Sequence, residues 1–209
     1  FKYRSKRDDP RWREMWDWAL FIGGFVPALV FGVAVGNVLQ GVHFRLSDEL
    51  RPFYEGGFFG LLNPFALLCG VLSVAMLVMH GGAWLGLKAT GMVARRARDY
   101  GVLAAAAVIV LFALGGVWIW LGIDGYRITA GITPDMASNP LRKEVAVEPG
   151  LWFANYATYP WMVIAPAMGF LGALGALLGL LRGREVSTFL FSKMSVVGII
   201  STVGLSMFP

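Results

Sequence analysis

Histidine and cysteine are the residue types that most often bind metals through nitrogen and sulfur, and this chain has few of them. It contains two histidines, His43 and His80, and one cysteine, Cys69. A single cysteine cannot form a Cys-x-x-Cys motif or a disulfide within the chain. Because Cys69 lies in an apolar run, we interpret it as a small buried hydrophobe rather than a redox thiol. We therefore predict no metal site.

Amide side chains within apolar stretches are the next candidates, because a polar group in a membrane is costly and often functional. Asn37 and Gln40 lie at the far end of the uncharged run 19–39. They could form hydrogen bonds between helices or line a path for protons or water, and the first role is the more common one. Asn63 precedes a proline and is typical of a helix cap.

The ionisable candidates are Asp17, directly before the same run, and His80, near the end of another apolar run. Asp17 could pair with Arg11 or Arg13, lie at the positive end of a helix, or collect protons. His80 could relay protons, since an imidazole titrates near neutral pH, or bond to backbone or headgroup groups at the membrane surface. Lys193 is able to direct its ammonium group toward the same surface.

No set of residues suited to covalent or acid–base catalysis is recognisable, whether a nucleophile with its base, paired carboxylates or a phosphate-binding loop. We predict no catalytic residue in this chain by itself. Ion-coupled transporters usually place ionisable groups near the membrane midplane, and the first four apolar runs carry none there. The basic pI of about 9.6 comes from short segments beside apolar runs, so we expect no nucleic-acid partner.

Long apolar helices must position these residues. Hydrophobic residues make up 57% of the 209 residues and charged residues only 15%, whereas a soluble domain carries more charge. Since about 20 apolar residues cross a bilayer, we predict an all-α polytopic membrane protein. The start without Met and the end within an apolar run suggest a fragment of a longer protein. We expect a single transmembrane domain over 1–209, with five helices at about 18–40, 58–80, 102–123, 160–181 and 189–209.

Glycines spaced four residues apart are a feature of several spans. Such spacing lets two helices approach closely, although each match is weak by itself in a chain this rich in glycine. The pairs are Gly32 and Gly36, Gly82 and Gly86, and Gly175 and Gly179. Proline is expected to bend or start helices at three positions, Pro27, Pro160 and Pro166.

The segments between the spans differ in charge. An excess of Lys and Arg marks segments 1–16, 88–100 and 182–188, whereas 42–57 and 124–150 are slightly acidic or balanced. The positive-inside rule therefore predicts that the three basic segments are cytoplasmic and the other two lie outside. The outer connection 124–150 is the longest and is rich in Gly and Pro, so we expect an ordered, turn-rich cap rather than a helix.

Several long strings occur in order along the chain: YRSK at 3–6, RWREMWDW at 11–18, FFGLLNPFALLCGVLSVAM at 58–76, GVWIWLGIDGY at 116–126 and SNPLRKEV at 138–145. In these strings and their spacing the chain resembles subunit II of cytochrome bd quinol oxidases over essentially its whole length. The N-terminal helices of that family, and whatever follows the fifth span, are absent from the match.

The resemblance implies a bacterial inner-membrane terminal oxidase that oxidises quinol and reduces dioxygen to water. It implies that haem b and haem d are held by subunit I and that subunit II ligates no haem. A structural quinone occurs in some members. The implied partners are the haem-bearing subunit I and the lipid bilayer, with small accessory subunits as further candidates.

Two observations on the residues agree with this division of roles. His43 and His80 are expected at opposite membrane surfaces, so they cannot ligate one haem. Methionine in an apolar helix is more often packing material than an axial ligand, and we interpret Met76, Met79 and Met92 in this way.

We expect the chain to form a packed wall against the haem-bearing subunit, with Trp84, Trp118 and Trp120 among its bulky residues. A secondary transporter and a passive membrane scaffold are the alternatives. A transporter would accumulate a substrate in vesicles without a haem partner, and a scaffold would be replaceable by other helices of similar packing.

Overall fold

The computed structural model describes residues 2–131, 135, 137 and 140–207. In this part of the chain five helical segments are long and apolar enough to cross a membrane, which confirms the all-α polytopic prediction. Their helices are α1 (Pro10–Gln40), α2 (Pro64–Lys88), α3 (Gly91–Gly122), α5 (Ile164–Arg182) and α6 (Glu185–Ser206). A short helix, α4 (Ala154–Thr158), and several 3-10 turns connect them.

The first two helices begin with a side-chain cap and a proline in the first turn. The Asp9 carboxylate accepts a hydrogen bond of 3.0 Å from the Arg11 backbone N–H at the start of α1. The Asn63 side chain accepts one of 2.8 Å from the Ala66 N–H at the start of α2, so the predicted cap is confirmed. Both caps satisfy N–H groups that a helix start leaves without a partner.

The helices extend beyond the predicted apolar spans. α1 begins at Pro10 instead of near 18, and α3 begins at Gly91 instead of near 102. The basic segment 88–100 is therefore mostly helical, and only two residues separate α2 from α3. Hydropathy marks the apolar core of a membrane helix, but the backbone hydrogen bonds continue through the charged turns beyond it. The predicted start at 58 falls in a 3-10 turn, and residues 208–209 of the fifth span lie outside the described part.

Two antiparallel hairpins form the longer connections, which the residue pattern did not predict as strands. They pair β1 (Phe44–Leu46) with β2 (Pro52–Tyr54), and β3 (Asp124–Ala130) with β4 (Glu144–Pro149). The described part of segment 124–150 contains these two strands, a 3-10 turn at Pro140–Arg142 and no α-helix, as expected. Residues 138–139 of the string SNPLRKEV, and the turns expected at 134 and 139, lie outside the described residues.

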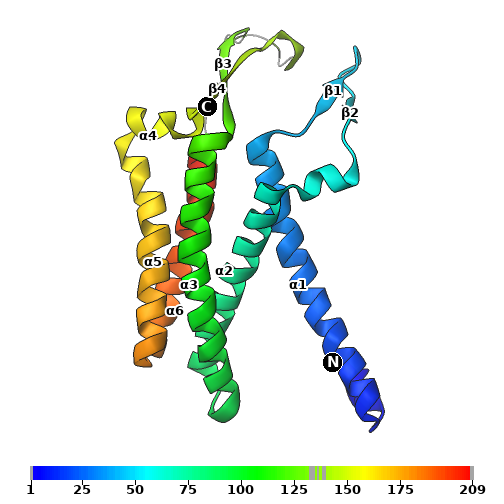
Figure 1. Ribbon diagram of the computed structural model, residues 1–209, viewed down its shortest axis with the longest axis vertical. Helices are drawn as coiled ribbons and strands as arrows, with labels where there is room; N and C mark the ends of the chain where they lie inside the picture. The colour runs from blue at the N-terminus through cyan, green and yellow to red at the C-terminus, as the bar shows by residue number, and fades with distance from the viewer. Residues whose placement is uncertain (1, 132–134, 136, 138–139, 208–209) are drawn as a thin grey trace.

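Figure 1 shows that both hairpins lie at one end of the bundle, which we call the hairpin end. The N-terminal segment and the short α2–α3 and α5–α6 connections lie at the opposite end, which we call the basic end. Helix α5 packs along α6, α2 packs on α3 and α6, and α1 packs on α2. Toward the basic end α1 stands apart from the other helices (Figure 1).

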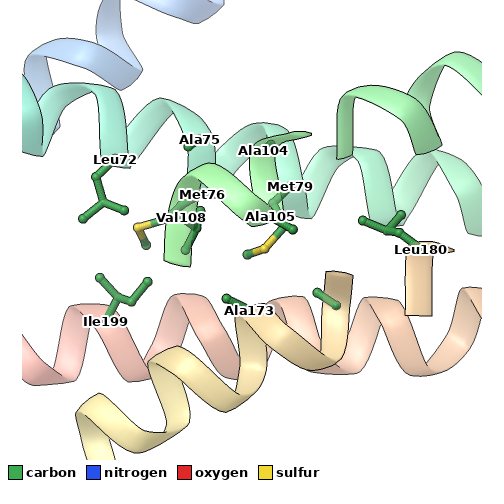
Figure 2. Packing of buried hydrophobic residues seen from close by; sticks show 11 residues of the cluster. Leu72, Ala75, Met76, Met79, Ala104, Ala105, Val108, Ala173, Leu180 and Ile199 are labelled. Atoms are coloured by element: carbon green, nitrogen blue, oxygen red, sulfur yellow. The ribbon is translucent and has the colours of Figure 1, made fainter. Parts of the chain in front are cut away.

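Four helices meet in the largest buried cluster, and Figure 2 shows their side chains facing one another. Met76 and Met79 of α2 lie against Val108 of α3, Ala173 of α5 and Ile199 of α6. The packing interpretation of these two methionines is confirmed. It is wrong for Met92, which is 67% exposed because it lies in the first turn of α3, beyond the core.

Two of the three prolines singled out above, Pro160 and Pro166, occupy positions that suit their missing N–H. Pro160 opens a 3-10 turn, and Pro166 lies in the first turn of α5. Pro27 lies inside α1, which continues as one helix through it. Cys69 is half-buried, so the interpretation as a buried hydrophobe is only partly correct.

Candidate functional site: polar groups and glycine contacts

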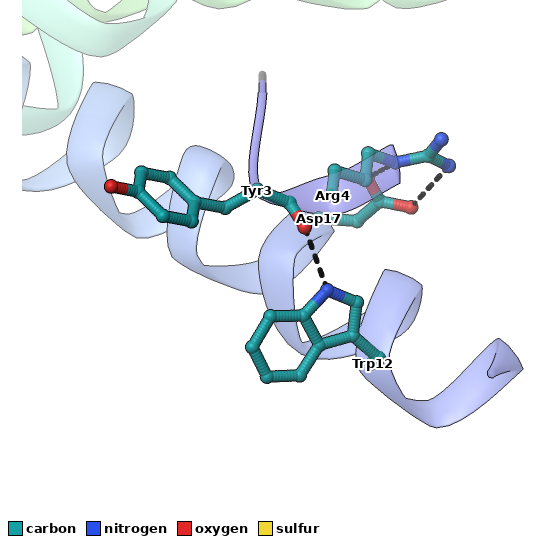
Figure 3. Close-up of polar contacts among 4 residues, drawn as sticks. All are labelled: Tyr3, Arg4, Trp12 and Asp17. Carbon is teal, nitrogen blue, oxygen red and sulfur yellow. Dashed lines mark hydrogen bonds and ion pairs between the residues drawn. The ribbon is translucent and has the colours of Figure 1, made fainter. Parts of the chain in front are cut away.

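Asp17 forms an ion pair with Arg4, and the two predicted partners are wrong (Figure 3). The Arg4 Nε and Nη2 donate to its carboxylate at 2.5 and 2.9 Å. Arg13, one helical turn before Asp17, instead pairs with Asp8 at 2.6 Å. The prediction that Asp17 lies at the positive end of a helix is also wrong. The helix dipole acts on charges in the first turn, and Asp17 lies beyond that turn because α1 begins at Pro10.

The N-terminal segment reaches Asp17 because aromatic residues fold it back along α1. The Trp12 Nε1 donates a hydrogen bond of 2.7 Å to the Tyr3 carbonyl, and Tyr3 stacks on Trp16 with ring centroids 5.5 Å apart. The hydrogen bond to Asp17 and then its negative charge raise the pKa of the Arg4 guanidinium. Both partners of the ion pair are exposed, so solvent screens it and its contribution to stability is small.

Asn37 connects α1 to the segment that precedes α2. Its Nδ2 donates to the Val33 carbonyl at 2.8 Å and to the Leu61 carbonyl at 2.7 Å. Its Oδ1 accepts a hydrogen bond of 3.3 Å from the Asn63 Nδ2. Asn37 is buried, and its bonds to Leu61 and Asn63 hold the hairpin-end half of α1 against the segment before α2, whereas the bond to Val33 stays within α1.

Gln40 lies one turn further along α1 and contacts the other hairpin. Its backbone carbonyl accepts a hydrogen bond of 3.1 Å from the Tyr126 hydroxyl of β3. Its side-chain Oε1 is buried and has no hydrogen-bond partner in the described part of the chain. The link from α1 to β3 therefore runs through the backbone of Gln40, not through its amide.

His80 joins α2 to α6. Its Nδ1 lies 2.9 Å from the Ser192 Oγ, and its ring stacks on Phe189 at 5.2 Å between centroids. The Ser192 hydroxyl also donates to the Phe189 carbonyl at 2.8 Å. Since a hydroxyl has one proton to donate, we assign the proton of the His80–Ser192 hydrogen bond to His80 Nδ1. In that tautomer the His80 Nε2 carries the free lone pair.

The two histidines lie far apart along the membrane direction. His43 is exposed between α1 and β1, at the hairpin end. His80 lies 16 residues after Pro64 on α2, a rise of about 24 Å from the start of that helix. Within the described residues no group of three or more His, Cys, Asp or Glu side chains comes together at a metal-binding distance. These residues do not fit the paired axial ligands of a haem.

Glycine brings α1 directly against α2. A Cβ placed on Gly32 would lie 2.7 Å from the Gly70 Cα and 2.7 Å from the Ser73 Cβ. A Cβ on Gly36 would lie 2.7 Å from the Ala66 Cα. These distances are shorter than any ordinary carbon contact, so the two backbones touch only because both positions lack a side chain.

Helices α5 and α6 also approach closely at glycines. Some of these glycines of α5 face side chains of α6, and another faces its backbone. A Cβ on Gly175 would lie 2.5 Å from the Phe191 ring, and one on Gly179 would lie 3.2 Å from the Thr188 Cα. Backbone meets backbone at Gly172, where a Cβ would be 2.7 Å from the Ser195 Cα. The Ser195 hydroxyl adds a hydrogen bond of 3.0 Å to the Gly169 carbonyl.

Comparison with known proteins supplies the family. The family model described as cytochrome bd terminal oxidase subunit II matches residues 1–209. A relative from Haemophilus influenzae, named "Probable cytochrome oxidase subunit 2", is 47% identical over the whole chain and 55% of its own length. The cytochrome bd-I ubiquinol oxidase subunit 2 of Escherichia coli K12 is 46% identical over the same shares. The chain belongs to the cytochrome bd terminal oxidase subunit II family.

A more distant relative shares less of the chain. The cytochrome bd ubiquinol oxidase subunit 2 of Bacillus subtilis is 27% identical over 98 residues, which is 47% of this chain and 28% of the relative. The chain spans about half the length of the Haemophilus and Escherichia relatives. The match to these relatives includes all five described helices that are long and apolar enough to cross a membrane.

Some contacts of this subunit II chain were missed in the residue pattern. Ser192 is the partner of His80, yet 112 residues separate them, and a serine in an apolar helix gave no signal of its own. Gly70 and Gly198 also lie in close helix contacts, although neither belongs to a four-residue glycine pair. A search for small residues on both facing helices, rather than for spacing within one helix, could have found them.

Proposed function

We propose that this chain is part of the membrane subunit II of a cytochrome bd-type quinol oxidase, which takes part in quinol oxidation and the reduction of dioxygen to water. The observation that carries the proposal is the identity of 46–47% over the whole chain to subunit 2 of bacterial terminal oxidases. The oxidase would work in the respiratory chain of the bacterial inner membrane.

In this proposal haem b and haem d belong to the partner, the haem-bearing subunit I, and quinol is the substrate of the complex. The separation of His43 from His80, and their setting, support the assignment of the haems to the partner. This chain contributes no catalytic residue by itself. A structural quinone and small accessory subunits belong to the same proposal as candidate components of the complex.

The mechanistic contribution of the chain is a rigid helical wall. The glycine contacts at Gly32, Gly36, Gly175 and Gly179 bring helices close enough to leave little space for water between them. Trp84, Trp118 and Trp120 are 40% to 67% exposed on this part of the subunit, so they are free to contact a neighbouring subunit or lipid. Such a wall would keep the oxygen-reducing site dry and shape the route of a small apolar gas.

The four polar candidates have different roles in this proposal. Asn37 and Gln40 are amides that do not titrate, and both amide hydrogens of Asn37 are engaged with carbonyls, so Asn37 is a joint between helices. Asp17 is held in a surface ion pair. His80 keeps one free ring nitrogen and is the strongest of the four as a carrier of protons.

We also propose that the basic end faces the cytoplasm, so that segments 1–16, 88–100 and 182–188 are cytoplasmic. The arrangement of these three segments at one end of the bundle, opposite both hairpins, supports this topology. In a full-length subunit whose other cysteines have been replaced, Ser187→Cys should be protected from an impermeant maleimide in whole cells, and Thr129→Cys should react. The reverse pattern would invert the topology.

The test of the oxidase role is a reduced-minus-oxidised absorption spectrum of membranes that hold the full-length subunit, with and without a bd-type subunit I. Bands of d-type haem and quinol-driven oxygen uptake are expected only when both subunits are present. Haem retained by the full-length subunit alone would contradict the assignment of the haems to subunit I. Substrate accumulation in vesicles without any haem dependence would replace the proposal with a transporter.

A further inference from the structure

Two aromatic rings from different helices form a pair near the basic end. Trp84 of α2 and Phe189 of α6 have ring centroids 5.2 Å apart, and Trp84 is 45% exposed. His80 stacks on the same Phe189 ring, and its hydrogen bond to the buried Ser192 ties α2 to α6 there. The ring pair is therefore held in place from both helices.

A lysine from each helix places its ammonium group over this ring pair. The Lys88 Nζ lies 5.4 Å from the Trp84 ring centroid, and the Lys193 Nζ lies 4.1 Å from the Phe189 ring centroid. Lys193 follows Phe189 by one helical turn, so its side chain reaches back toward the start of α6 at the basic end. Each cation therefore lies over one ring of the pair.

Neither of the two lysines forms an ion pair within the described part of the chain. Helix α2 has no acidic residue, and the single acid of α6, Glu185, lies two turns before Lys193 and is exposed. Two cations gathered without a counterion attract an anion, most strongly where a low-dielectric membrane adjoins them.

An exposed apolar stripe continues from the same lysine along α6. Val197 and Ile200 follow Lys193 on the same helical face, away from the basic end, and are 53% and 62% exposed. A hydrocarbon chain could lie on this stripe while a headgroup phosphate meets the ammonium groups. A free phosphate ion would contact only the two ammonium groups and would make no use of the apolar stripe.

We propose that Lys88 and Lys193, above the Trp84–Phe189 ring pair, bind the headgroup of an anionic phospholipid whose acyl chains lie along α6. The proposal depends on the proposed topology only for the name of the leaflet, which would be the cytoplasmic one. Basic positions between membrane helices on that side are suited to anionic headgroups.

The test uses the full-length subunit in its complex, reconstituted in nanodiscs that contain phosphatidylglycerol and phosphatidylcholine. Two samples are compared: in one the phosphatidylglycerol is brominated, and in the other the phosphatidylcholine is brominated. Bromine quenches nearby tryptophan, and the difference between the natural protein and Trp84→Phe isolates the Trp84 signal. Brominated phosphatidylglycerol should quench Trp84 at about a tenfold lower mole fraction than brominated phosphatidylcholine, because each lysine contributes to the attraction. Lys88→Gln with Lys193→Gln should abolish that preference.

Two controls separate charge from misfolding. Lys88→Arg with Lys193→Arg keeps both charges and should retain the preference, and Arg142→Gln with Lys143→Gln, near the hairpin end, should leave it unchanged. Equal quenching by the two lipids in the natural protein would overturn the proposal. Absence of quenching by either lipid would also overturn it, because another part of the complex would then cover Trp84. Neither result bears on the haem spectrum that tests the oxidase role.

Discussion

The apolar run 19–39 of α1 carries no charge, but only its hairpin-end half packs against another long helix in the described part of the chain. Toward the hairpin end, Gly32 and Gly36 press against the backbone of α2. Toward the basic end, a Cβ on Gly23 or Gly24 would find no heavy atom within 4 Å, and Phe21 is 56% exposed. Neighbouring glycines in the same helix therefore have opposite surroundings.

The difference follows from how the helices cross. Helices inclined to one another touch only near the crossing, and α1 diverges from α2 toward the basic end (Figure 1). The apolar run does not reveal where the crossing lies, because lipid and protein interior are both apolar surroundings for an uncharged helix face. The exposed half of α1 is thus a surface for lipid, another part of the subunit or a partner, and the glycine content does not distinguish these.

The largest expected effect is that of Gly32→Ala. The new Cβ would overlap the backbone of α2 near Gly70, which must move, and we expect a loss of about 1–3 kcal/mol of stability and reduced assembly of the complex. Thermal denaturation of the purified full-length complex, followed by haem absorbance, measures the loss. The matched control is Gly23→Ala, which meets open space and should cause no loss. Equal destabilisation by both substitutions would abolish the contrast between the halves of α1.

The same contrast can be sharpened within the α5–α6 contact. Gly172→Ala places its Cβ against the Ser195 backbone and should cost about 1–3 kcal/mol. Gly175→Ala meets the ring of Phe191, which is 40% exposed and able to turn away, so its cost should be below about 1 kcal/mol. Denaturation midpoints of the two variants, compared in one detergent, give the order. A larger cost for Gly175→Ala would show that side-chain adjustment does not decide these contacts.

Asn37 is the polar end of the packed half of α1. Asn37→Ala removes hydrogen bonds to Leu61 and Asn63 and leaves the Leu61 carbonyl without this partner, which should cost about 1–3 kcal/mol. Gln40→Leu is the control, because its buried Oε1 has no partner in the described residues and its removal should be close to neutral. The same melting assay applies. An assembled Asn37→Ala complex that lost oxygen uptake while keeping its stability would favour a path for protons or water at this residue.

The smallest effect is expected from Arg4→Ala, which removes the ion-pair partner of Asp17 in the basic-end half of α1. The ion pair with Asp17 is 40% and 51% exposed at its two side chains, so water and salt screen it. Melting temperatures of Arg4→Ala and the natural protein should agree within error at 150 mM salt or above. A clear loss would mean that the folded-back N-terminal segment holds α1 in place, contrary to the weak role assigned to this half.

Most of the secondary structure could be predicted from neighbouring residues. The apolar runs predicted five helices, and the Asn63 cap followed from an amide before a proline. The helix ends were less accurate, because hydropathy says nothing about charged turns such as Gly91–Tyr100. The hairpins were missed because their strands are short and mostly exposed, so burial imposes no clear alternation on them.

The candidate site depended more on tertiary structure. Asp17 pairs with Arg4 rather than Arg13 because stacking of Tyr3 on Trp16 folds the N-terminal segment back along α1. The spacing of residues within α1 could not predict this contact, because Arg4 lies outside the helix. The roles of Gly175 and Gly179 in packing, and of His80 as a carrier of protons, remain predictions.

By itself the sequence determined the class of the molecule: apolar runs long enough to span a membrane, caps that start helices, and basic segments before the first span and at every other connection after it. These properties depend on hydrogen bonds and hydration within a turn or two of each residue. Only the tertiary structure decided that Gly32 touches α2 while Gly23 touches nothing, and that His80 meets Ser192. The physical reason is that a contact between helices depends on where and at what angle they cross, which the spacing within one helix does not contain.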